Sequence, residues 1–309
     1  MPKIYKSTEE LIGNTPLLEA RNLEEKFNLK CRLLLKLEYL NPTGSVKDRA
    51  AKAILDDAEH RGIIGKNSVI IEATSGNTGI GLASVGTSRG YRVIIVMPDS
   101  MSKERRTLMS AYGAELVLTD GKDGMAGAIR RAEELAREIP NSFIAGQFDN
   151  PANAKAHYDT TGPEIYNDTD GEVDIFVAGV GTGGTLTGIG EYLKSKKQSV
   201  KVVAVEPDTS AVLSGDVAGA HGIQGIGAGF IPSILNTDIY DEVVRVSDSE
   251  AYSTARLLGT SEGILVGISS GAALYAGIEL AKREENEGKT VVVLLADTGD
   301  RYLSTPMFN

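Results

Sequence analysis

The feature that most limits the fold of this chain is a regular alternation, from residue 68 onward, of short β-branched runs with longer helical stretches. Residues 68–73 (SVIIEA) and 91–98 (YRVIIVMP) are two such runs, and the stretch between them, 80–89, ends at Gly90, a residue typical of helix ends. Parallel strands joined by crossover helices produce this pattern. The sequence therefore predicts an α/β fold with mostly parallel sheets.

The alternation continues to the end of the chain. Further strands are expected at residues 114–119, 142–148, 173–180, 201–206, 242–246 and 290–295. Further helices are expected at residues 101–112, 124–139, 186–197, 248–258 and 270–285. Ser247 and Glu250 have the spacing of a capping box at the start of one of these helices.

Two segments interrupt the pattern. Residues 149–170 are polar and contain Pro151 and Pro163, which predicts a domain boundary near residue 150. Between 207 and 241 glycines accumulate without periodicity, and a loop of that length inside a compact domain is usually functional. A length of 309 residues also favours two domains, at the usual size of about 150 residues each.

Composition narrows the classes of ligand. The chain has 32 Lys and Arg against 42 Asp and Glu, a net charge of −10 that suits a small-molecule ligand better than the nucleic-acid backbone. The longest aliphatic stretch, residues 291–296, is far shorter than the roughly 20 residues of a membrane span. With one cysteine and no signal-like N-terminus, we expect a cytoplasmic protein that binds no membrane.

Cysteine and histidine predict no further chemistry. Cys31 shares one strand face with Leu33, Leu35 and Leu37, so we expect a core residue rather than a nucleophile. The three histidines lack the spacing and the Cys or carboxylate neighbours of a metal cluster, so no metal is expected.

Two glycine-rich turns each follow a predicted strand and precede a predicted helix. The first is the asparagine loop, residues 74–78 (TSGNT), and the second is the glycine cup, residues 181–185 (GTGGT). Glycines let a ligand approach the backbone, and the free N–H groups and dipole of a helix start favour an anion. Both turns are therefore candidate anion sites, and the threonines make the cup suitable for a phosphate.

A dinucleotide is a competing ligand for the second turn. Gly179, Gly181 and Gly184 fit a G-x-G-x-x-G pattern after a strand, and Glu206 follows at the spacing of an acid that binds ribose. This alternative stays open on that segment alone. It does not explain the asparagine loop.

Lys47 is the third candidate feature. It follows a Pro/Gly turn and starts a helix expected to run to about residue 61, on the same stripe as Ala51, Ile54 and Ala58. Desolvation and the positive helix end would lower the pKa of an amine placed there, so that it could condense with a carbonyl. An isolated lysine of this kind could instead snorkel or pair with an acid. Together with two anion sites it favours pyridoxal 5′-phosphate and an amino-acid substrate.

At this point the chain resembles a known family. The segments 45–49 (SVKDR), 74–79 (TSGNTG), 181–185 (GTGGT), 225–230 (GIGAGF) and 267–271 (GISSG) occur in the order seen in the cysteine synthase (O-acetylserine sulfhydrylase) family. The likeness extends from residue 15 to residue 305. It implies fold-type II architecture, similar to the tryptophan synthase β chain, with two three-layer domains.

The resemblance also implies how the domains divide. Residues 1–12 and 38–150 would form a smaller, mobile domain that carries Lys47 and the asparagine loop. Residues 13–37 and 151–309 would form a larger domain that carries the glycine cup and Ser269.

The family's roles are carried over residue by residue as implications of the resemblance. Lys47 resembles the lysine that bonds to the cofactor and removes the α-proton, Asn77 the asparagine on the cofactor's 3′ oxygen, and Ser269 the residue on the pyridine nitrogen. The expected phosphate ligands are Gly181, Thr182, Gly183, Gly184 and Thr185. The expected ligands of the substrate carboxylate are Thr74, Ser75, Gly76, Thr78 and Gln147.

The implied reaction is the β-replacement that converts O-acetyl-L-serine and sulfide to L-cysteine and acetate through an α-aminoacrylate intermediate. The alternative is cystathionine β-synthase-type replacement with homocysteine as nucleophile, because Ala73, Gly146 and residues 296–299 depart from the usual pattern. The resemblance also implies a homodimer and a partner, the C-terminal tail of serine acetyltransferase. A catalytically silent binding protein of this fold is disfavoured by the presence of Lys47, Asn77 and Ser269.

Overall fold

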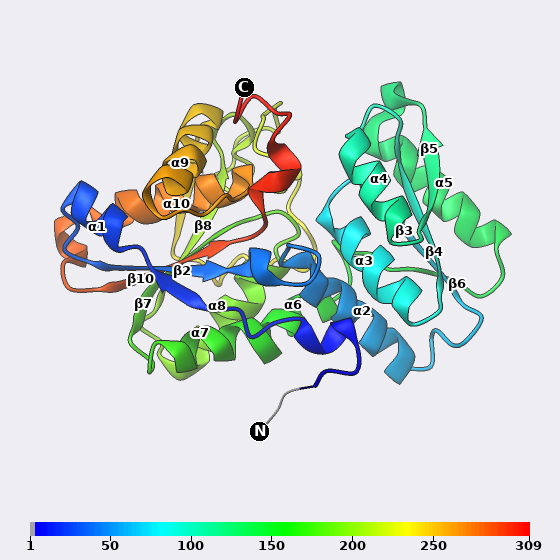
Figure 1. Ribbon diagram of the computed structural model, residues 1–309, viewed down its shortest axis with the longest axis horizontal. Helices are drawn as coiled ribbons and strands as arrows, with labels where there is room; N and C mark the ends of the chain where they lie inside the picture. Colours follow the sequence, from blue (N-terminus) through cyan, green and yellow to red (C-terminus); the bar gives the residue numbers. More distant parts are fainter. Residues whose placement is uncertain (1–3) are drawn as a thin grey trace. The chain divides into compact units, whose positions relative to one another are not determined.

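The chain forms two compact units in the computed structural model, which describes residues 4–309 (Figure 1). The first unit contains the residues through Ile12 together with Lys47–Asn153, and the second contains Gly13–Val46 and Ala154–Asn309. The division falls after Val46 rather than at residue 37, because Val46 N donates to Ala296 O over 2.8 Å and Gly44 O accepts from Thr298 N over 3.1 Å. Mobility of the smaller unit stays a prediction.

The first unit is a parallel sheet between two helical layers. The strand order is β5-β4-β3-β6, with β3 Val69–Ala73, β4 Arg92–Pro98, β5 Glu115–Thr119 and β6 Ser142–Ile144. Its helices are α2 Lys47–His60, α3 Asn77–Ser88, α4 Lys103–Ala111 and α5 Gly124–Glu138. The core on one sheet face includes residues of α2, α3 and α4, and the core on the other face is closed by α5.

Two element boundaries in this unit differ from the sequence expectation by three residues or more. Helix α3 begins at Asn77 rather than at residue 80, so the asparagine loop is partly its first turn. Strand β6 ends at Ile144 rather than at residue 148, because Gly146 has a left-handed φ of +66° and turns the chain out of the sheet. Gln147 consequently lies in a turn.

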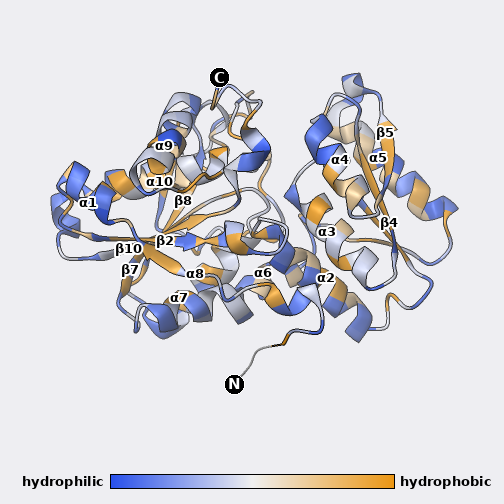
Figure 2. Ribbon diagram, in the orientation of Figure 1, coloured by the Kyte–Doolittle hydropathy of each residue, from blue (hydrophilic) through white to orange (hydrophobic). Residues whose placement is uncertain are grey.

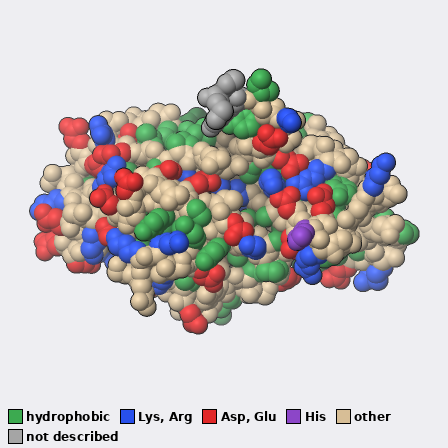
Figure 3. Space-filling model, turned by 90° about the horizontal axis from the view of Figure 1, so that it is seen from below, with side chains coloured by type: hydrophobic (Ala, Val, Ile, Leu, Met, Phe, Trp, Pro, Cys, Tyr) green, Lys and Arg blue, Asp and Glu red, His purple; other side chains and the backbone are tan. Residues whose placement is uncertain are grey.

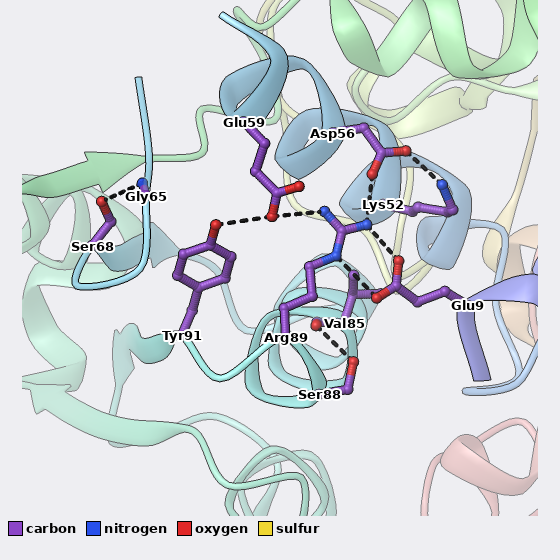
Figure 4. Close-up of polar contacts among 10 residues, drawn as sticks. All are labelled: Glu9, Lys52, Asp56, Glu59, Gly65, Ser68, Val85, Ser88, Arg89 and Tyr91. Atoms are coloured by element: carbon purple, nitrogen blue, oxygen red, sulfur yellow. Dashed lines mark hydrogen bonds and ion pairs between the residues drawn. The ribbon is translucent and has the colours of Figure 1, made fainter. Parts of the chain in front are cut away.

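An ion network attaches the N-terminal segment to the rest of the first unit (Figure 4). Arg89, just after α3, bonds through Nε to Glu9 Oε1 over 2.9 Å and through Nη2 to Asp56 Oδ1 over 2.6 Å. Its Nη1 also lies 3.2 Å from Glu59 Oε1, the oxygen that accepts from the Tyr91 hydroxyl over 2.8 Å. The guanidinium is mostly buried, so these carboxylates hold α2, α3 and the 3₁₀ turn Thr8–Leu11 together.

The second unit contains a larger sheet, also covered on both faces. The strand order is β1-β2-β10-β7-β8-β9, with β1 Leu17–Glu19, β2 Arg32–Leu37, β7 Val173–Gly179, β8 Lys201–Pro207, β9 Glu242–Val246 and β10 Thr290–Leu295. Only β1 is antiparallel to its neighbour in this described sheet. Figure 2 shows the central strands as apolar, as expected of strands buried on both faces.

The helices of the second unit form the two outer layers. One core joins α1 Arg21–Phe27, α9 Asp248–Ser261 and α10 Ile268–Ala281 to one face of the sheet, and another joins α7 Gly162–Asp168 and α8 Gly184–Lys196 to the opposite face. Ser247 and Glu250 form the expected capping box of α9. Further 3₁₀ turns of this unit lie at Glu38–Leu40, Asp208–Ser210, Glu284–Asn286 and Gly299–Tyr302, and the first unit has one at Gly121–Asp123.

The segment 149–170 has more regular secondary structure than its polar, proline-interrupted sequence predicts. It contains α6 Ala152–Ala156, a π-helical turn His157–Thr161 and α7 in immediate succession. Pro163 is accommodated near the start of α7, where its missing N–H is not needed. The expected long irregular segment between 207 and 241 is confirmed, since between β8 and β9 it contains only the turn Asp208–Ser210.

Cys31 is a core residue, as expected. Its side chain is buried next to β2, and its Sγ lies 2.7 Å from Asn286 O. Desolvation raises the pKa of the thiol. A nucleophilic thiolate is therefore disfavoured at this position.

Charge is dispersed on the surface that Figure 3 shows, where acidic and basic side chains alternate. Across the described residues, no helix has both the length and the apolar character needed to cross a membrane. Within residues 4–309, no three His, Cys, Asp or Glu side chains are grouped so that they could hold a metal ion.

Candidate active site

Lys47 is the first residue of α2 and is half-buried. The residues that share its stripe, Ala51, Ile54 and Ala58, are buried, as the helical spacing predicts. Helix α3 packs closely here, because a Cβ on Gly81 would lie only 3.0 Å from Lys47 O and 3.1 Å from Ala51 Cβ. The backbone that carries the Lys47 amine is thus fixed by helix packing.

The asparagine loop connects the carboxyl end of β3 to α3. Thr74 N donates to Val96 O over 3.0 Å and Thr74 Oγ1 accepts from Gly76 N over 3.2 Å, which sets the direction of the turn. Gly76 is the N-cap and has no side chain to cap the helix amides. Hydroxyls and helix-start N–H groups together suit a carboxylate.

Gln147 is brought to the asparagine loop although it lies far along the chain. Its Oε1 accepts from Thr78 Oγ1 over 2.6 Å, and its carbonyl accepts from Asn153 Nδ2 over 2.9 Å. Both side chains of the Thr78–Gln147 pair are buried. The structure therefore brings Gln147 together with the asparagine loop, as expected of residues that bind one substrate carboxylate.

Glu72, in the same strand as the loop, was not among the sequence candidates. It is the only charged residue of β3, it is 3% exposed, and it accepts from Gly146 N over 2.8 Å and from Gln147 N over 3.4 Å. Desolvation raises its pKa to about 7, although the bonds from Gly146 and Gln147 oppose the shift. The sequence signal that could have identified Glu72 is that it is a single acidic residue inside the apolar run 68–73.

The glycine cup lies between β7 and α8 in the second unit. Gly183 is the N-cap of α8 with a φ of +87°, which favours glycine. A Cβ on Gly181 would lie 2.3 Å from Gly225 O, so no side chain fits there. Thr182 and Thr185 are buried in the same turn.

His157 supports the cup and was considered in the sequence only as a metal ligand. Its Nε2 lies 3.2 Å from Thr185 Oγ1 and its Nδ1 lies 2.9 Å from Thr161 Oγ1. The ring is fully buried within the π-helical turn. This turn has no recognisable periodicity in sequence, so the link could not be predicted.

Ser269 lies in the first turn of α10 and is buried. A Cβ on Gly225 would lie 3.5 Å from Ser269 Oγ, and the same glycine's carbonyl adjoins Gly181. Gly225 therefore lies between the cup and Ser269, within the irregular segment 207–241. The expected phosphate and ring-nitrogen ligands are neighbours in the second unit.

The dinucleotide alternative fails at Glu206. This carboxylate is buried and accepts from Leu213 N over 2.7 Å, Ser214 N over 3.0 Å and Ser214 Oγ over 2.6 Å. Both oxygens are thus occupied in folding the following loop. Because the carboxylate is also 2% exposed, it is not available to bind the hydroxyls of a ribose.

The donor set fits a phosphorylated pyridine cofactor. The cup offers helix-start amides and two buried threonine hydroxyls on a turn that admits no side chain at Gly181, which suits a phosphate in close contact with the backbone. The neighbouring Ser269 hydroxyl is a neutral partner for a ring nitrogen. Considered by itself, the helix-start Lys47 has an amine of the kind that condenses with an aldehyde.

Comparison with known proteins agrees with this chemistry. A family model described as pyridoxal-phosphate dependent enzyme matches residues 8–297. A probable cysteine synthase of Bacillus subtilis is 53% identical over 100% of this chain and 99% of its own length. The crystal structure of cysteine synthase from Entamoeba histolytica has a TM-score of 0.97 and 49% identity, covering 99% of this chain and 91% of that one.

A hydrogen sulfide-producing enzyme from Fusobacterium nucleatum is also similar, with a TM-score of 0.94, 43% identity, and coverage of 98% of this chain and 99% of that one. The matches extend across both units. The chain belongs to the family of pyridoxal-phosphate dependent enzymes and has their fold-type II architecture.

Proposed function

We propose that this chain is a cysteine synthase that converts O-acetyl-L-serine and sulfide to L-cysteine and acetate. The observation that carries the proposal is the pairing of two separate anion sites with a helix-start lysine, in a chain 53% identical to a probable cysteine synthase. One anion site suits a cofactor phosphate and the other suits the carboxylate of an amino acid.

The family resemblance assigns the cofactor ligands residue by residue. Gly181, Thr182, Gly183, Gly184 and Thr185 would bind its phosphate, Ser269 its ring nitrogen, Asn77 its 3′ oxygen, and Lys47 its aldehyde carbon. Bound in this way, pyridoxal phosphate withdraws electrons from the Cα of an amino acid. These assignments are supported by the family resemblance and by the donor sets described above.

The remaining residues would act on the substrate. Thr74, Ser75, Gly76, Thr78 and Gln147 would bind the substrate carboxylate, and Lys47 Nζ would accept the proton from Cα. The Cβ–O bond then breaks and acetate leaves with its electron pair. Hydrosulfide forms the new Cβ–S bond, and the proton returns to Cα.

A steady-state comparison tests the reaction. At equal enzyme concentration, kcat/KM for cysteine from O-acetylserine and sulfide should exceed kcat/KM for cystathionine from serine and homocysteine. A higher value for cystathionine would assign the chain to the alternative β-replacement. Absence of both products from cofactor-loaded protein would contradict a β-replacement enzyme of either kind.

Family resemblance also supports the proposals that the protein is a homodimer and that it binds the C-terminal tail of serine acetyltransferase. The single cysteine supports a third proposal, that the protein is cytoplasmic. Light scattering of the loaded protein tests the first, and localisation of a tagged copy tests the third. A peptide that copies such a tail should compete with O-acetylserine. Failure of the peptide to inhibit would remove the partner and leave the chemistry standing.

A further inference from the structure

Glu72 lies where a carboxylate has no evident structural need. Its neighbours in β3 are apolar, and β3 pairs with β4 and β6 through ordinary backbone hydrogen bonds. The last bond of this pairing joins Ala145 N to Ile71 O over 3.0 Å. Beyond it the turn leaves the sheet, and the next two amides, Gly146 N and Gln147 N, point to the Glu72 carboxylate.

These bonds connect Glu72 to the asparagine loop. Gln147 is held at its amide by Glu72, at its carbonyl by Asn153, and at its side chain by Thr78. Thr78 belongs to the first turn of α3. Glu72 therefore contacts one proposed carboxylate ligand, Gln147, directly and reaches a second, Thr78, through it.

Burying this acid is unfavourable unless hydrogen bonds compensate. Its oxygens accept from the main-chain amides of Gly146 and Gln147 and from the Gln147 side chain, and a neutral amide in the same place could accept at only one oxygen. Above pH 7, where Glu72 is ionised, its carboxylate accepts from both amides and so fixes the turn in both position and direction.

We propose that Glu72 is a positioning residue that orients Gln147 and Thr78 for recognition of the substrate carboxylate. The proposal rests on the proposed function, in that it assumes an amino-acid substrate at the asparagine loop. Glu72 is expected to influence how tightly a free carboxylate binds. It is not expected to influence how tightly the same amino acid binds when its carboxylate is blocked as an ester.

The test uses the cofactor-loaded full chain and two probes, L-serine and L-serine methyl ester, titrated by the change in cofactor absorption. In Glu72→Gln the Kd of L-serine should rise about tenfold, as expected for loss of one charge-assisted hydrogen bond, while the Kd of the ester stays unchanged. If Glu72→Gln does not fold, Asn153→Ala releases the same turn from its other side and should show the same selectivity.

Asp174→Asn is the matched control. Asp174 also accepts a backbone amide, Thr290 N, over 2.9 Å, but at the amino end of β7, away from the strand end that carries the cup. It should lower the melting temperature without changing the ratio of the two Kd values. Equal weakening of acid and ester by Glu72→Gln, or no weakening of either, would overturn the proposal.

Thr74→Ala separates this proposal from the proposed function. If Thr74→Ala does not selectively weaken L-serine, the asparagine loop is not the carboxylate site and the role of Glu72 fails with it. If Glu72→Gln is selective but the wild-type protein makes no cysteine from O-acetylserine and sulfide, the proposed reaction fails and the role of Glu72 stands.

Discussion

The asparagine loop and the glycine cup occupy the same place in their two units, between a parallel strand and the helix that follows it, yet they are built differently. The cup is closed by close packing of its glycines: a Cβ on Gly181 would meet the backbone atom Gly225 O at 2.3 Å, and a Cβ on Gly183 would meet the side-chain atom Leu235 Cβ at 2.7 Å. The asparagine loop is shaped by side chains, through Thr78 and Gln147 and through Thr74 Oγ1.

The difference matches two kinds of ligand. A turn held by close packing keeps one shape, which suits a cofactor that stays bound through many turnovers. A turn held by a few side-chain hydrogen bonds, with Ser75, Gly76 and Asn77 only half-buried, can adjust to a substrate that enters and leaves. The predictions below test this division, from the largest effect to the smallest.

Lys47→Ala should separate chemistry from cofactor retention. Because the cup is intact, the variant should still bind pyridoxal phosphate, while turnover falls by at least about 10⁴-fold with the loss of the proposed base. Borohydride reduction of the wild-type protein should attach the cofactor to the peptide that contains Lys47. Lys52→Ala, in the same helix and paired with Asp56 at the surface, is the control and should keep full activity. Attachment at another lysine would contradict the assignment.

Gly181→Ala should weaken binding of the cofactor, which Lys47→Ala should leave intact. A methyl group there must displace the carbonyl of Gly225, so the affinity for pyridoxal phosphate should fall by about 100-fold, measured by equilibrium dialysis. Gly65→Ala, where a Cβ would meet nothing within 4 Å, is the matched control. A Gly181→Ala protein that retains the cofactor fully would show that the cup is not its phosphate site.

Thr74→Ala and Gln147→Ala should each raise KM for O-acetylserine by about tenfold, because one hydrogen bond to the carboxylate or its support is lost. KM for sulfide and cofactor content should not change. Ser88→Ala, which alters a hydroxyl at the other end of α3, should leave KM unchanged. If the loop variants lost the cofactor and Gly181→Ala kept it, the two turns would have been assigned in reverse.

Stability should depend on pH through Glu72. Its folded pKa of about 7 lies above the ordinary 4.5, with desolvation as the main cause and Asp149 adding to it. The stabilisation is therefore complete below pH 4.5 and is lost as pH rises through 7, by up to about 3 kcal/mol. Urea unfolding at pH 5 and pH 8 should show this loss in the wild type and not in Glu72→Gln. If the free energy of unfolding changed equally between pH 5 and pH 8 in the two proteins, this role of Glu72 in stability would be contradicted.

Glu242, in the second unit, should show the reverse dependence with a smaller effect. Hydrogen bonds from Arg283 and Lys201 lower its pKa to about 2 against the desolvation that raises it. Its stabilisation is present above pH 4.5 and is lost as pH falls through 2. Because the side chain is 25% exposed, Glu242→Gln should lower the free energy of unfolding at pH 7 by only about 1 kcal/mol. A loss of equal size at pH 2 would rule out this ion pair as the cause.

Much of the fold could be predicted because its signals are local. β-Branched runs bounded by glycine marked the central strands, and the spacing of Lys47, Ala51, Ile54 and Ala58 marked the buried side of α2. The two glycine-rich turns were visible for the same reason, since each lies directly between a strand and a helix. The end of β6 was predicted wrongly, because residues 142–148 contain apolar residues on both sides of Gly146.

What the sequence by itself determined was the alternating α/β order, the buried cysteine, and the residue types available for chemistry, because hydrophobic periodicity and turn composition act over a few neighbouring positions. Only the tertiary structure decided which distant residues meet. Gly225 adjoins both Gly181 and Ser269, His157 reaches Thr185, and Glu72 holds Gln147. Those contacts depend on how strands order themselves in a sheet and how an irregular loop folds back, which long-range packing sets and which no local pattern records.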